Sequence, residues 1–72
     1  MNATLTDLRN ATRALADAST PRDKRTALDH GIRVARSYRN VNEDAICNHG
    51  TAAQRAYTAW KLLETKTRKE LS

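Results

Sequence analysis

Residues 20–39 have the sequence TPRDKRTALDHGIRVARSYR and predict one capped helix around which the fold is organised. The side chain of Thr20 is placed to accept from free N–H groups, Pro21 suits the first helical position, and Asp23 is placed to complete a capping box. A cap of this kind contributes on the order of 1 kcal/mol to helix stability. We therefore expect a helix over residues 21–39.

This helix has one face of small residues and an opposite face of arginines. At about 100° per residue, Ala27, Gly31 and Ala35 share the middle of the first face. A glycine in a helix interior costs about 1 kcal/mol relative to alanine, so its place on a buried face indicates that a bulky neighbour approaches closely. Trp60 is the side chain that we expect there.

Three further helices are predicted around the first. Capping boxes at Thr4 and Thr51 begin helices over residues 5–18 and 52–70. Asn42 is placed to cap a short helix over residues 43–49 that stops at Gly50. The connections are short, which makes successive helices antiparallel neighbours. The sequence therefore predicts an all-α fold, a compact bundle of three long helices and one short helix, in a single domain over residues 1–72.

The chain is basic, with a formal net charge of +5, and the excess charge is unevenly placed. Residues 21–40 hold six cationic and two acidic side chains, a balance of +4, and residues 51–72 hold five and two, a balance of +3. Residues 1–20 have a net charge of zero. The charge therefore lies on two of the predicted helices, where it favours nucleic acid, an acidic protein surface or anionic lipid as a partner.

Motifs for catalysis are missing from the sequence. It contains no Gly-rich phosphate loop, no nucleophile elbow and no His-Glu-x-x-His, and its carboxylates are scattered beside arginines. A core of this size also leaves little room for a water-excluding pocket. We therefore expect a protein that is not an enzyme and needs no cofactor.

Cys47, His49 and Asp44 form the one cluster that resembles a metal site. A structural zinc site needs four ligands, usually in two pairs, and the second pair is missing because His30 lies on another predicted helix. We therefore expect no metal, a buried Cys47 and a polar His49 at a helix end, with a metal shared across a dimer as the remaining alternative.

The expected location is cytoplasmic, without a membrane partner. The single cysteine excludes an intramolecular disulfide. The sequence shows neither a signal-peptide pattern nor an apolar run of the roughly 20 residues that a membrane span needs.

The arginine face is the candidate functional feature. Asp29 is spaced to form i,i+4 ion pairs with Arg25 and Arg33, as on an ordinary solvated face. One aspartate cannot neutralise four arginines, however, and the planar guanidinium suits phosphate. We predict a small basic nucleic-acid-binding or regulatory protein, in which nucleic acid or an acidic partner contacts Arg22, Arg25, Arg33, Arg36, Arg55, Lys66 and Lys69.

A second class of function stays open at this point. A protein–protein interaction module, such as a small adaptor or inhibitor encoded by a mobile element, could use the same basic surface to dock on an acidic partner. Steep salt dependence with bare duplex favours nucleic acid, whereas co-purification with one protein and no duplex affinity favours the module.

The sequence also predicts a candidate helix-turn-helix and a candidate partner contact. The short helix, the turn at residues 49–51 and the last helix have the order of a helix-turn-helix, in which Gln54 and Arg55 are the obvious base-reading side chains. Leu62 falls on the basic face of the last helix, so we expect it to be exposed and to contact a partner. With so thin a core, the chain is expected to form a homo-oligomer, most simply a dimer.

Overall fold

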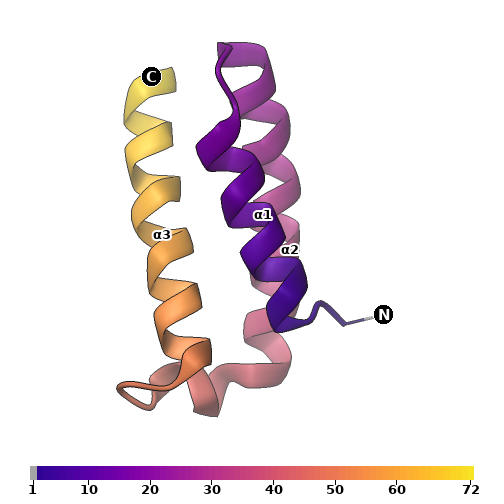
Figure 1. The fold of residues 1–72 in the computed structure, drawn as a ribbon, viewed down its shortest axis with the longest axis vertical. Coiled ribbons are helices and arrows are strands. Elements are labelled where there is room, and N and C mark those ends of the chain that lie inside the picture. Colours follow the sequence, from indigo (N-terminus) through magenta and orange to yellow (C-terminus); the bar gives the residue numbers. More distant parts are fainter. Residues whose placement is uncertain (1) are drawn as a thin grey trace.

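The computed structural model describes residues 2–72, which fold into a compact bundle of three helices (Figure 1). Helix α1 covers Leu5–Asp17, α2 covers Pro21–Cys47 and α3 covers Ala52–Leu71. The helices run up, down and up, and every pair is in contact. The predicted all-helical class is confirmed. The predicted number of helices is wrong, because the expected short helix over 43–49 is not a separate element.

Threonine side chains cap all three helices, although only one full capping box forms. At α1, Thr4 accepts from the Asp7 N–H at 3.1 Å and the Asp7 carboxylate accepts from the Thr4 N–H at 2.9 Å. At α2, Thr20 accepts from the Asp23 N–H, without the reciprocal bond to the Asp23 carboxylate. At α3, Thr51 accepts from the Gln54 N–H. At Thr20 and Thr51, the predicted hydrogen bond to the threonine side chain forms, and the predicted reciprocal bond to the threonine N–H does not.

The third cap is completed one residue earlier than predicted. The Gln54 side-chain oxygen accepts from the Gly50 N–H at 3.4 Å and leaves the Thr51 N–H to bond the Asn48 carbonyl. Gly50 has φ of 88°, in the left-handed region that glycine adopts without steric cost. Glycine at this position lets the chain reverse between α2 and α3.

The expected break between two helices at Asn42 is a kink inside α2. Asn42 has φ −119° and ψ 24°, yet helical structure continues to Cys47. Its side-chain amide donates to the Tyr38 carbonyl at 3.0 Å, the acceptor that a regular helix pairs with the Asn42 backbone N–H. The Asn42 side chain therefore supports the kink. The prediction that Asn42 is the N-cap of a separate helix is wrong. Beyond the kink, the last turn of α2 bends toward α3 (Figure 1).

The core is built from few side chains, with Trp60 at its centre. Leu8 and Trp60 are fully buried, and the other buried hydrophobic residues of the cluster are Leu15, Leu28, Ala35, Tyr38 and Ala53. The six-membered ring of Trp60 lies against the backbone of Gly31, as the sequence predicts. Because α2 has no side chain at this position, it can approach the indole of α3 directly.

The prediction that Cys47 is buried is wrong. It is exposed at the end of α2, where we expected a small buried residue. The segment after the kink is so short that its last residue lies outside the bundle core. His49 is exposed in the turn beyond the helix. Within residues 2–72, no helix is long and apolar enough to cross a membrane.

Candidate phosphate-binding surface

The four predicted arginines of α2 form a row on its solvent face. We call Arg22, Arg25, Arg33 and Arg36 the arginine row. All four are exposed, and from Arg22 to Arg36 the row extends about 21 Å at 1.5 Å per residue. Within residues 2–72, none of the four takes part in an ion pair. The row therefore presents free guanidinium groups to solvent.

The ion pairs that the spacing predicts around Asp29 do not form. Asp29 pairs with neither Arg25 nor Arg33 in the part of the chain that is described. Exposed i,i+4 pairs stabilise a helix by only a few tenths of a kcal/mol, which is too little to hold two long side chains together. Asp29 therefore leaves the positive charge of the arginine row largely unneutralised.

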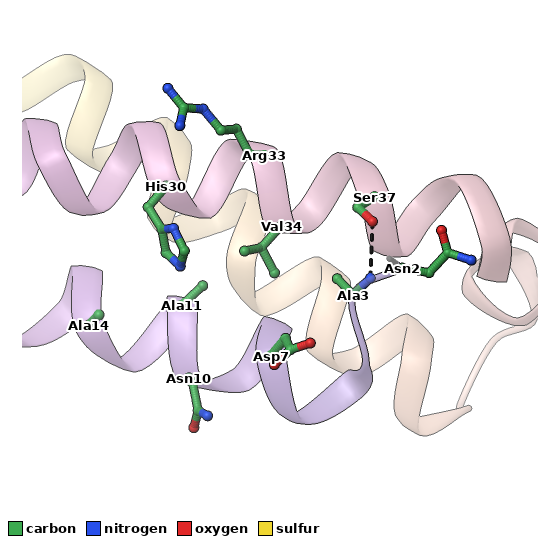
Figure 2. A pocket seen from close by; sticks show the side chains of 10 residues that line it. All are labelled: Asn2, Ala3, Asp7, Asn10, Ala11, Ala14, His30, Arg33, Val34 and Ser37. Atoms are coloured by element: carbon green, nitrogen blue, oxygen red, sulfur yellow. Dashed lines mark hydrogen bonds between the residues drawn. The ribbon is translucent and has the colours of Figure 1, made fainter.

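The other predicted contact residues lie on α3, apart from the arginine row. Arg55, Lys66 and Lys69 are all exposed on α3, and Arg55 also lines a hollow between α1 and α3. Leu62 is 69% exposed, as predicted. Arg33 borders the groove between α1 and α2, where its guanidinium points away from α1 (Figure 2). The structure thus gathers the α2 arginines into one row and leaves Arg55, Lys66 and Lys69 apart from it.

Arg36 connects the row to a polar groove between α2 and α3. This groove has a volume of about 320 Å³. Its charged lining consists of four cations and two carboxylates, namely Arg36, Arg39, Lys61, Arg68, Glu43 and Glu64. The groove therefore keeps a formal balance of +2, and its cations lie on both helices.

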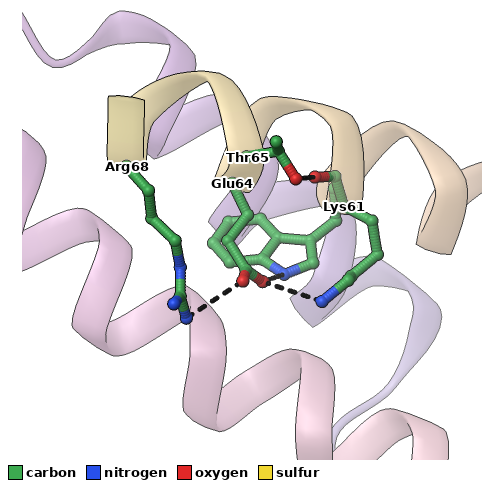
Figure 3. Close-up of polar contacts among 5 residues, drawn as sticks. Lys61, Glu64, Thr65 and Arg68 are labelled. Carbon is green, nitrogen blue, oxygen red and sulfur yellow. Dashed lines mark hydrogen bonds and ion pairs between the residues drawn. The ribbon is translucent and has the colours of Figure 1, made fainter. Parts of the chain in front are cut away.

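Glu64 organises the α3 side of this groove (Figure 3). It is only 7% exposed, and its carboxylate accepts from the indole N–H of Trp60 at 3.1 Å. The same carboxylate pairs with Arg68 at 3.1 Å and with Lys61 at 3.5 Å. One buried charge thus satisfies the buried indole and holds two cations at the groove.

Sequence reasoning missed Arg39, Lys61, Glu64 and Arg68 as residues of this groove. A signal for Glu64 was present, because a buried tryptophan needs an acceptor for its N–H and Glu64 lies one helical turn beyond Trp60. The signal for Arg39 was weaker. Its position between the arginine face and the packed face becomes meaningful only once α3 is placed beside it.

Neither the helix-turn-helix nor a metal site is supported by this geometry. Only residues 43–47 follow the kink, which is too short for the first helix of such a motif. The Gln54 amide is bonded to Gly50 and Thr58 rather than free to read a base. No group of three His, Cys, Asp or Glu residues in the described chain could hold a metal ion.

Comparison of the chain with protein families, with characterised proteins and with solved structures found no match.

Proposed function

We propose that this protein binds the phosphate backbone of nucleic acid through the arginine row, and that it acts by binding, without catalysis. The cations of the α2–α3 groove extend the same surface toward α3 through Arg36 and Arg39. In this proposal the protein works in the cytoplasm, on nucleic acid that is accessible there.

The observation that carries the proposal is the unpaired state of the row. Four exposed arginines lie within about 21 Å without an ion pair in the described residues. That length corresponds to about six phosphates of one strand at 3.4 Å each. Arginine forms bidentate hydrogen bonds with phosphate oxygens, and displacement of the counterions that surround nucleic acid favours the complex.

The proposed contact is with the backbone rather than with the bases. Base reading requires side chains such as Arg, Asn or Gln placed against base edges from an element that enters a groove. Gln54, the one amide that the sequence offered for this role, is engaged at the start of α3. We therefore expect binding that depends little on nucleotide sequence.

Reversal of charge within the row tests the proposal. Arg33→Glu/Arg36→Glu should weaken binding to a labelled duplex of arbitrary sequence by about 100-fold or more at low salt, because two phosphate contacts become repulsive. The measurement is fluorescence anisotropy. Both arginines are exposed, so circular dichroism should show an unchanged helix content.

Arg9→Glu/Arg13→Glu is the matched control. It makes the same change in net charge, from +5 to +1, on the exposed surface of α1. We expect a much smaller loss of affinity. Equal losses from the two pairs would mean that duplex responds to net charge alone, and absence of duplex binding by the parent would favour an acidic protein surface as the partner.

A further inference from the structure

A wide groove lies between α1 and α2, on the side away from α3. It has a volume of about 670 Å³ and is lined by Ala3, Ala11, Ala14 and Val34, while the His30 imidazole points from α2 toward α1 (Figure 2). The backbone N–H of Ala3 donates to the Ser37 hydroxyl at 3.0 Å, which fixes the N-terminal segment at one end. A second hollow, which shares Ala14 and His30 with the first, continues the groove toward Asp17 and Asp23.

This groove is acidic, although the protein is basic. Its lining includes Asp7 at one end and Asp17 and Asp23 at the other. The one arginine of the lining, Arg33, points away from α1 (Figure 2). None of the three aspartates forms an ion pair within the described residues. The groove therefore fits a helix that carries cations at both ends and an apolar residue between them.

The solvent face of α3 has that pattern. Arg55, Ala59, Leu62, Lys66 and Lys69 recur at intervals of four and three residues, so they share one face of the helix. All five are exposed. Leu62 is one of the two exposed large hydrophobic residues of the described chain. We call these five residues the α3 outer face.

We propose that the α3 outer face of a second copy of this chain docks in the α1–α2 groove. The register supports a helix that runs parallel to α1. If Arg55 of the incoming copy lies at Asp7, Leu62 lies seven residues farther along, as Ala14 does from Asp7. Lys66 then lies eleven residues from Arg55, and Asp17 lies ten from Asp7. Both charged ends and the apolar centre match in this one alignment.

The proposed contact joins two different surfaces of identical chains. In each copy, α3 lies on the other side of the bundle from the α1–α2 groove, so a docked copy keeps its own groove free. Such a contact is head-to-tail and continues to further copies unless the assembly closes into a ring. The arginine row remains outside the contact, apart from Arg33 at the groove edge.

Sedimentation velocity from micromolar to millimolar concentration tests the proposal. The parent should associate in steps, and added salt should weaken association because the ion pairs lie at an exposed rim. Leu62→Glu should weaken it by about tenfold or more, through loss of the apolar contact. Val41→Glu is the matched control, because Val41 is 56% exposed and lies outside both surfaces. It should associate like the parent.

A mixing experiment identifies the contact as head-to-tail. Ala14→Lys/Asp17→Lys blocks the groove and leaves the α3 outer face intact, whereas Leu62→Glu does the reverse. Each variant alone should be monomeric at concentrations at which the parent associates. Their mixture should form a 1:1 complex that grows no further, because only one groove and one face remain competent. Ala16→Lys/Asp29→Lys places the same changes on exposed positions outside the groove and should associate like the parent.

Two outcomes overturn the proposal. One is a parent that stays at 8.1 kDa at millimolar concentration. The other is association that Leu62→Glu abolishes and Ala14→Lys/Asp17→Lys leaves intact, since that result means that two α3 helices pair with each other.

Discussion

Gly31 and Trp60 lie in direct contact, with the indole ring of α3 against the bare backbone of α2. A Cβ atom on residue 31 would lie 2.8 Å from Trp60 Cζ2, and still closer to Cη2 and Cζ3. Trp60 is fully buried, so its ring cannot move aside without disturbing the packing of the core. This contact sets the close approach of α2 and α3, and thereby the width of the groove that carries Arg36 and Arg68.

Substitution of Gly31 should therefore be destabilising even for alanine. Overpacking costs about 1–3 kcal/mol, and the better helix propensity of alanine offsets about 1 kcal/mol of it. We expect a loss of up to about 2 kcal/mol for Gly31→Ala and of about 3 kcal/mol or more for Gly31→Leu. Urea denaturation followed by circular dichroism measures both.

Ala16→Leu is the control for this series. Ala16 is exposed on α1, so the added volume meets solvent and stability should change by only about 0.5 kcal/mol. A Gly31→Leu variant as stable as the parent, with unchanged Trp60 fluorescence, would show that the indole does not lie against Gly31.

The second prediction concerns the carboxylate of Glu64. Glu64→Leu leaves the buried indole N–H of Trp60 without its acceptor, which should cost about 1–3 kcal/mol. Glu64→Gln keeps an acceptor oxygen and loses only the charge, so its cost should be smaller. The free energy of unfolding from urea titration distinguishes the two.

Glu43 provides the matched control in the same groove. It is exposed and takes part in no ion pair among residues 2–72. Glu43→Leu should change stability by about 0.5 kcal/mol at most. If Glu64→Gln proves as harmful as Glu64→Leu, the charge is the important feature of Glu64 and the indole hydrogen bond is not.

The third prediction concerns the ion pair between the first turn of α2 and the last turn of α3. Lys24 Nζ lies 2.6 Å from Glu70 Oε2. The hydrogen bond and charge of Lys24, together with the charge of Lys66, lower the pKa of Glu70 from its usual 4.5. Because the folded state has the lower pKa, the pair stabilises the fold above pH 4.5, and this stabilisation is lost as pH falls through the folded pKa.

Glu70→Gln should therefore melt below the parent at neutral pH, and the difference should vanish under acidic conditions. Lys24→Met should show the same pH dependence. The double variant should melt like either single one, because each removes the same pair. A difference between Glu70→Gln and the parent that grows as the pH is lowered would contradict the assignment.

Much of the fold could be predicted because local signals agreed with packing. The threonine caps, the small face of α2 and the lone tryptophan all pointed to helices that meet at Gly31. The kink at Asn42 could not be predicted from local signals. An asparagine that caps a new helix and one that bonds back to the carbonyl four residues earlier have the same sequence context, and packing decides between them.

The candidate site was only partly predictable for a related reason. The arginine row follows from periodicity along one helix, so the sequence shows it directly. The groove beside it depends on which side of α2 faces α3. For this reason Arg39, Lys61 and Arg68 join the site in the structure, whereas Arg55 lies on another side of the bundle.

The most direct test of the central claim is the salt dependence of duplex binding. If each arginine of the row contacts one phosphate, the logarithm of the binding constant should fall linearly with the logarithm of salt concentration, with a slope of about −3.6 or steeper. In Arg33→Glu/Arg36→Glu the slope should become shallower by about 2, and in Arg9→Glu/Arg13→Glu it should stay near the parent value. Absence of duplex binding by the parent at low salt, or an equal change of slope in both variants, would contradict the claim that the arginine row binds the phosphate backbone.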